Sequence, residues 1–204
     1  MCISGKELGG VYSAGELTQL LGSVGENVSI NRSVVFYSPQ NIHIGSNVRI
    51  DCFCILASGA DGIVIGDYVH IGAYSALFGS LGQIRMESFS GLSARVLLFT
   101  STDDYTDGFL ANPTVPDKYK RVRKGDIVLE RHAIIGAGSV VMPGVTLGVA
   151  ASAGAMTFLH RSVSEFAIVV GCPMRVVGRR NARILDLEAE FLAEKNLGAI
   201  PAGR

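Results

Sequence analysis

The chain has 204 residues, and its 18 lysines and arginines balance its 18 aspartates and glutamates. A neutral chain has no general attraction to nucleic acid or to an anionic membrane surface, so composition supports neither partner. No apolar stretch reaches the length of a membrane span, and the opening MCISGKELGG contains no apolar run. We therefore expect no signal peptide, no membrane insertion and a cytoplasmic location.

A short helix is predicted over about residues 13–22. Ser13 and Glu16 have the spacing of a capping box, and Leu17, Leu20 and Leu21 follow with helical periodicity. We expect residues 1–27 to form a segment that caps the N-terminal end of the region that follows.

From residue 28 the sequence repeats every six residues. This period fits neither a helix nor one long strand, but it fits a parallel β-helix whose coils have three short strands each. We predict an all-β domain over residues 28–170, in which lead residues 18 apart stack on one another and two three-residue slips, at 58–62 and 80–82, lie at corners. The lead positions include Ile65, Ile71 and Leu77, then Met86, Leu92 and Leu98, then Leu129, Ile135, Val141, Leu147, Ala153 and Leu159.

The repeat stops between residues 100 and 127. Repeat proteins tolerate insertions at corners, and such insertions gather on the functional face, so we predict an ordered arm. Its NPTVP segment (112–116) is predicted to be extended and rigid. Its basic run KYKRVRK (118–124) suits the phosphates of coenzyme A or of a nucleotide-linked sugar, and is too short to indicate nucleic acid.

Beyond the repeat, residues 171–204 are predicted to form a turn and a helix. The turn is GCP (171–173), and the helix should run from Asn181 to about Asn196, with Gly198 as its stop. We expect this helix to act as a cap or to contact a partner.

Three motifs carry a resemblance to a known family. IIGAGSVVMPGVTLG (134–148), VVGCPMRVVG (169–178) and STDDYTDGFLANPTVP (101–116) together resemble the hexapeptide-repeat acyltransferases. The branch is that of maltose and galactoside O-acetyltransferases and surface-polysaccharide sugar acetyltransferases. The resemblance implies a left-handed parallel β-helix, a homotrimer, and acetyl-CoA bound in grooves between subunits.

The catalytic position departs from the family pattern. In that branch a histidine follows a Phe-Thr-Ala-Thr-like run and serves as the base, whereas here the run from Phe99 to Thr102 is followed by Asp103. Asp103 and Asp104 are candidate catalytic residues, because burial beside a second carboxylate could raise the pKa of one of them. His132, in the first hexad after the arm, is a further candidate. The alternative is that both aspartates only cap the loop.

Tyr105 and Asn112 in the arm, and His70 in the hexads, are candidate contacts for the acceptor. His70 and His132 could also be two ligands of a zinc site, but such a β-helix site needs three histidines, so we expect no metal.

For coenzyme binding, small residues that allow close backbone approach and cations that pair with phosphates are the candidates. They are Gly136, Ala137, Gly154, Ala155, Arg161 and Arg175, and Arg179 is an alternative to Arg161 as the partner of Arg175.

The predicted function is acetyl transfer from acetyl-CoA to a hydroxyl or amine of a sugar or nucleotide-sugar, in surface-polysaccharide synthesis. The alternative is a β-helix scaffold or ligand-binding module without catalysis, which the missing histidine favours. The intact coenzyme motifs argue against that alternative.

Overall fold

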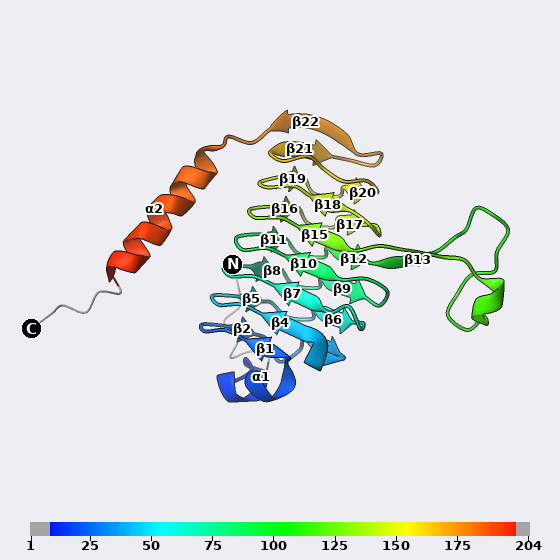
Figure 1. The fold of residues 1–204 in the computed structure, drawn as a ribbon, viewed down its shortest axis with the longest axis horizontal. Helices are drawn as coiled ribbons and strands as arrows, with labels where there is room; N and C mark the ends of the chain where they lie inside the picture. Colours follow the sequence, from blue (N-terminus) through cyan, green and yellow to red (C-terminus); the bar gives the residue numbers. More distant parts are fainter. Residues whose placement is uncertain (1–8, 199–204) are drawn as a thin grey trace, which may run out of the picture.

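The computed structural model describes residues 9–198, and it confirms the predicted parallel β-helix (Figure 1). The opening residues 1–8, on which most of the signal-peptide expectation depends, and residues 199–204 lie outside the described part. Neither helix in the described range is long and apolar enough to cross a membrane.

Three sheets form the sides of the coil, and each complete coil contributes one strand to each sheet. The first sheet contains β1 (Ser23–Val24), β4 (Ile42–Ile44), β7 (Ile63–Ile65), β10 (Ile84–Met86), β15 (Ile127–Leu129) and β18 (Thr146–Leu147). The second contains β2 (Ser29–Ile30), β5 (Arg49–Ile50), β8 (His70–Ile71), β11 (Gly91–Leu92), β16 (Ile134–Ile135), β19 (Ser152–Ala153), β21 (Ala167–Val170) and β22 (Arg175–Arg179). The third contains β3 (Val35–Tyr37), β6 (Ile55–Ser58), β9 (Ala76–Gly79), β12 (Leu97–Phe99), β17 (Val140–Val141) and β20 (Phe158–Leu159).

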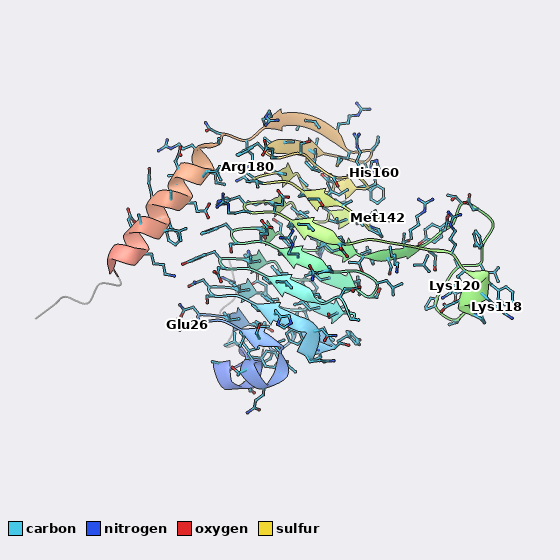
Figure 2. The ribbon with its side chains drawn as sticks, in the orientation of Figure 1. Glu26, Lys118, Lys120, Met142, His160 and Arg180 are labelled. Atoms are coloured by element: carbon cyan, nitrogen blue, oxygen red, sulfur yellow. The ribbon has the colours of Figure 1, made fainter. Side chains whose placement is uncertain are left out.

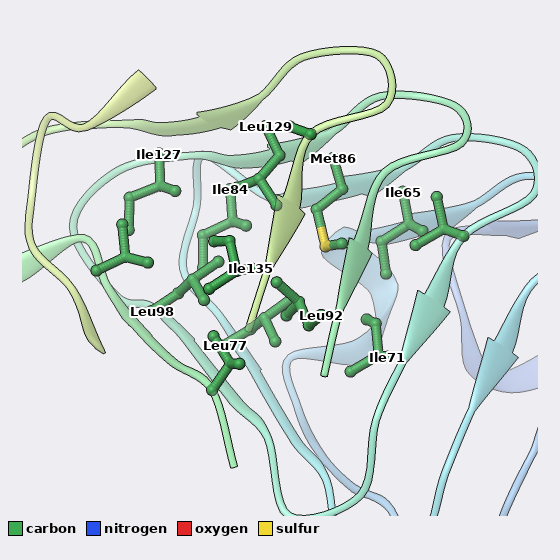
Figure 3. Packing of buried hydrophobic residues seen from close by; sticks show 14 of the residues in the cluster. Ile65, Ile71, Leu77, Ile84, Met86, Leu92, Leu98, Ile127, Leu129 and Ile135 are labelled. Atoms are coloured by element: carbon green, nitrogen blue, oxygen red, sulfur yellow. The ribbon is translucent and has the colours of Figure 1, made fainter. Parts of the chain in front are cut away.

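The six-residue leads point inward and build the core (Figure 3). Leu129, Ile135 and Val141 are completely buried. Ile135 pairs in register with Ala153, as the 18-residue spacing predicts. Alternate residues of each strand point outward, so most two-residue strands have one buried lead beside one exposed or half-buried position.

The coils turn at three corners, which we name by their surroundings. The helix corner, between the first and second sheets, carries Tyr68, Phe89 and His132; the open corner, between the second and third sheets, carries Phe53, Tyr74 and Arg95. All six residues have positive φ, between 56° and 63°. Backbone of this kind favours Gly and Asn, so six bulky side chains here are unusual.

The arm leaves the third corner, between the third and first sheets, which we call the arm corner, and it projects to one side of the coil (Figure 1). It consists of β13 (Ser101–Asp103), a loop containing the 3₁₀ turn η2 (Asp117–Tyr119), and β14 (Val122–Lys124), which pairs antiparallel with β13. Met86 pairs with Leu129 across this insertion, so the coil resumes in phase. Residues Pro39–Asn41 form a second 3₁₀ turn, η1.

Two helices flank the coil. The helix α1 (Ala14–Leu20) has the predicted capping box, with Ser13 and Glu16 bonded to each other's backbone, and Leu17 is buried against the coil. The helix α2 (Arg183–Gly198) follows β22, which turns back antiparallel on β21, and it runs beside the coil on the side away from the arm (Figure 1).

Candidate functional site

The root of the arm is fixed to the coil by Thr100. This residue is completely buried, its hydroxyl donates to the carbonyl of Phe78 (3.1 Å), and its carbonyl accepts from Gly125 N–H (3.0 Å). Both strands of the arm are therefore held where they leave the coil, so that the residues directly beyond Thr100 have a defined position.

Asp103 links the root of the arm to its far loop. Its Oδ2 accepts the backbone N–H of Asn112 (2.7 Å), whose φ is 92°. The Asn112 side chain in turn accepts from the N–H and hydroxyl of Thr114 (2.9 and 2.6 Å). The NPTVP segment is thus a turn, and the predicted extended conformation is wrong, because the Asn112 side chain organises the backbone locally.

Asp104 is buried within the arm itself, with its side chain 1 % exposed. Its Oδ1 accepts from the hydroxyl and N–H of Thr106 (2.6 and 2.9 Å), and these bonds hold the pKa of Asp104 below its usual value. Its Oδ2 has no hydrogen-bond partner, and the Nε atoms of Arg121 and Arg123 lie 3.7 Å away. A carboxylate held in its ionised form organises the loop, and a raised pKa does not occur at Asp104.

Beside the arm root lies an open pocket of about 510 Å³, which we call the arm pocket. Its walls combine the carboxylate of Asp103 and the cation of Lys120 with apolar surface from the third sheet. Tyr105, 76 % exposed, stands at this pocket with its hydroxyl 3.0 Å from that of Thr102. The lining residues are Leu81, Phe99, Ser101, Thr102, Asp103, Tyr105, Pro113, Lys120, Val122 and Met142.

His132 lies elsewhere, at the helix corner. Its Nε2 is 2.8 Å from Oε2 of Glu188 in α2, both side chains are 8 % exposed, and its ring stacks on Phe89. Arg180 donates to the carbonyl of His132 (2.8 Å), and Figure 2 shows Arg180 on the side opposite the arm. Within one chain, therefore, His132 is not brought together with Asp103.

The candidate coenzyme residues lie at the upper open corner and the end of the coil. A Cβ on Gly136 would lie 2.5 Å from the backbone nitrogen of Ala155, so the coils pack too closely for a side chain there. Ala137 and Ala155 are exposed, as are Arg161 after β20 and Arg175 in β22, whereas Gly154 is half-buried and follows β19. The glycine signal at Gly136 thus has a packing cause, and the small exposed side chains of Ala137 and Ala155 lie beside the exposed Met156.

His70 stands on the outer face of the second sheet. Its Nε2 is 2.9 Å from Oδ2 of Asp51, and the other oxygen of Asp51 accepts from Arg49 Nε (2.8 Å). Sequence reasoning found His70 and missed its two neighbours. The signal was present, because Arg49 pairs in register with His70 from one coil before, and Asp51 follows Arg49 by two positions on the same outward face.

Sequence reasoning also missed Lys120 and Met142 in the arm pocket. Lys120 was one cation within a basic run, and Met142 occupied an ordinary outward position of a hexad. Figure 2 places Met142 on the side of the coil from which the arm projects, with His160 above it.

No protein-family model matches the chain. A dTDP-4-amino-4,6-dideoxy-D-glucose acyltransferase of Escherichia coli is 38% identical over 169 residues, which cover 83% of this chain and 88% of that protein. WbbJ of Escherichia coli K12, named for O-acetyl transfer in lipopolysaccharide biosynthesis, is 22% identical and covers 70% of both chains.

The solved structures include AntD, an N-acyltransferase from Bacillus cereus, in complex with dTDP and 3-hydroxybutyryl-CoA. It is 42% identical, with a TM-score of 0.87, and covers 91% of this chain and 98% of AntD. AntD has also been solved with one serine replaced, in complex with dTDP-4-amino-4,6-dideoxyglucose and coenzyme A, and with an aspartate ten positions later replaced.

Proposed function

The chain belongs to the hexapeptide-repeat acyltransferases, and on that premise we propose that it acylates the amino group of a nucleotide-linked 4-amino-4,6-dideoxy sugar. Its relatives of about 40% identity act on or bind this acceptor. The observation that carries the proposal is the replacement of the family's histidine by Asp103 at the wall of the arm pocket.

An amine acceptor explains why the histidine is dispensable. A sugar hydroxyl needs a base near neutral pKa in order to become nucleophilic, and a carboxylate of ordinary pKa serves poorly. An unprotonated amine already carries its nucleophilic lone pair. Asp103 then has an orienting role: its carboxylate attracts the amine and accepts a hydrogen bond from it while the nitrogen attacks the thioester carbon.

The acyl donor is a coenzyme A thioester, which supplies an activated acyl carbon and a thiolate leaving group. We propose that the small exposed side chains of Ala137 and Ala155 let the pantetheine arm approach the backbone, and that Arg175, with Arg161, pairs with the phosphates. As the carbon–sulfur bond breaks, the proton from the acylated nitrogen passes to the sulfur, so the products are an amide and the free thiol. Acetyl-CoA is the donor that the family resemblance implies, and 3-hydroxybutyryl-CoA is the alternative that AntD suggests.

A second residue of this site is proposed from spacing. Of the nine aspartates in this chain, only Asp103 has a serine ten positions before it, Ser93. That is the separation of the serine and the aspartate replaced in AntD. Ser93 precedes β12 and Asp103 follows it, so in one chain they lie beyond opposite ends of this strand.

We propose that neighbouring copies in a homotrimer bring these two residues together. The outward face of the third sheet supports this, because it is apolar along its length, with Val35 45 % and Tyr37 60 % exposed and with Phe78 stacked on Phe99. Three such faces packed together would set the open corner of one copy beside the arm corner of the next. Sedimentation equilibrium should give three times the 21.6 kDa of one chain, and a monomer that transfers acyl groups would contradict the shared site.

The test of function is a free-thiol assay with acetyl-CoA or 3-hydroxybutyryl-CoA against a panel of nucleotide-linked sugars. Thiol release should depend on a 4-amino-4,6-dideoxy sugar, and the 4-hydroxy analogue should be a poor acceptor. Release with hydroxyl sugars alone would refute N-acylation. No thiol release and no calorimetric binding of either donor would favour the scaffold alternative.

We place this reaction in surface-polysaccharide synthesis and in the cytoplasm, where nucleotide-linked sugars and acyl-CoA are both available. The relation to WbbJ supports that role. Deletion of the gene in its host should leave the surface polysaccharide without its N-acyl group, and an unchanged polysaccharide would exclude this assignment.

A further inference from the structure

Gly91 occupies an outward strand position that has no need of glycine. A Cβ added there would meet only the backbone oxygen of His70, at 3.4 Å, which is an ordinary contact, and its φ lies outside the left-handed region. At Gly136, by contrast, a Cβ would collide with the next coil. A glycine inside a strand costs about 0.5–1 kcal/mol relative to alanine and often marks the close approach of a ligand or of another backbone.

The neighbours of Gly91 give this empty position one polar side and one apolar side. The register places His70 one coil below and Ile134 one coil above. The His70 ring is held by Asp51 at 2.9 Å, whereas Ile134 is 42 % exposed. Because the coils rise by about 4.8 Å each, His70 and Ile134 stand about 10 Å apart, with no side chain between them.

Ser93 lies beside this space, two residues along from Gly91. It is exposed and stands at the open corner, and Arg95, two residues further, holds its guanidinium 5.8 Å over the ring of Tyr74. Ser93, the second proposed site residue, and Arg95, a cation suited to a diphosphate, therefore lie two and four positions after Gly91.

We propose that the space over Gly91, between His70 and Ile134, receives the pyranose ring of the acceptor; we call it the Gly91 gap. This inference rests on the proposed function and adds to it where the sugar lies. A 4-amino-4,6-dideoxy sugar has hydroxyls for a hydrogen bond with the imidazole of His70, and its C6 methyl group matches the apolar side chain of Ile134. The diphosphate extends from the ring toward Arg95.

Gly91→Val tests the gap without weakening the fold. The chain accommodates a Cβ at this position and valine is β-branched, so the melting temperature should be unchanged or higher. We expect kcat/KM for the nucleotide-linked amino sugar to fall at least 100-fold, while the KM for acyl-CoA stays within about twofold. Ser29→Val, in the same outward column of β2 and far from the arm, is the matched control and should leave both parameters unchanged.

Ile134→Thr tests whether Ile134 determines the preference for a 6-deoxy acceptor. A purely structural role of Ile134 would not change this preference. Wild-type protein should prefer the 6-deoxy acceptor over its 6-hydroxy analogue, and Ile134→Thr should reduce that preference about tenfold. His70→Asn should raise the KM for the acceptor with little change in the KM for the donor.

These experiments distinguish a failure of the proposed function from a failure of the Gly91 gap. If wild-type protein acylates no nucleotide-linked amino sugar, the proposed function fails. If wild-type protein is active and Gly91→Val keeps its acceptor kcat/KM within threefold, the function stands and the Gly91 gap is refuted. Loss of activity together with dissociation of the oligomer also overturns the inference, because a neighbouring copy would then occupy the gap.

Discussion

Replacing His132 by alanine should loosen α2 from the coil and leave acyl transfer almost unchanged. The imidazole connects the helix corner to α2 through Glu188, and both side chains are nearly buried. The same side chain was a candidate base, so this single substitution decides between an anchoring role and a catalytic one.

The expected loss of stability follows from two contacts of the His132 side chain. Removing the imidazole leaves the Glu188 carboxylate buried without that partner, which costs about 1–3 kcal/mol. It also removes the stack on Phe89, whose ring centroid lies 5.1 Å away, a contact of about 0.5–1.5 kcal/mol. We expect a total of about 2–4 kcal/mol, expressed mainly as local opening of α2, because Phe191, Lys195 and the Arg131–Glu188 ion pair also join α2 to the coil at this same corner.

Hydrogen exchange across Arg183–Gly198 measures that opening, and steady-state kinetics measure transfer. Exchange in α2 should accelerate at least 30-fold in His132→Ala and by a similar factor in Glu188→Ala. The double variant should lose less than the sum of the two single variants, because each substitution removes the same hydrogen bond. Unchanged exchange in α2 with a 100-fold loss of kcat in His132→Ala would refute the anchor and restore His132 as a base.

Three further outcomes can be checked on the same protein. Since its bonds with Thr106 lower the pKa of Asp104, the ionised form is favoured in the folded arm; its stabilisation is complete above pH ~4, the ordinary Asp pKa, and is lost as the pH falls further. Protease resistance of the arm should therefore drop below pH ~4 in wild-type protein and vary less with pH in Asp104→Asn, and an identical profile in both would contradict this role. Gly136→Ala forces a methyl group to 2.5 Å from the backbone of Ala155, so thermal denaturation should show a loss of about 1–3 kcal/mol; an unchanged melting temperature would show that the coils can separate there. Burial raises the pKa of Cys54 to about 12, so iodoacetamide should label the exposed Cys172 and leave Cys54 unmodified, and peptide mass spectrometry showing Cys54 labelled in folded protein would exclude such burial.

The coil itself could be predicted from the sequence because its rule is local. Every six-residue lead must point inward, and Ile135 and Ala153 show that an 18-residue spacing is enough to place two strands side by side. The arm could be located for the same reason, since an interruption is visible against a strict period.

The roles of individual polar residues could not be predicted in the same way. The partner of His132 lies 56 residues away on α2, and no local pattern says which corner that helix will contact. Asp104 looked like a possible base until its bonds with Thr106 were visible. Ser93 resembled every other corner serine, and only the spacing of the residues replaced in AntD singled it out.

The regular stacking of the coils has a consequence for how such a protein can change its substrate. Gly91, Ile134 and Ser152 pair in succession up the outer face of the second sheet, so each step along that face is about 4.8 Å. Side chains on this face can therefore be placed only at intervals of one coil. A larger acceptor or a longer acyl chain could be accommodated by placing a small residue one coil higher or lower on this face, with the backbone unchanged. Selectivity among such proteins should therefore differ in steps of one coil rather than continuously.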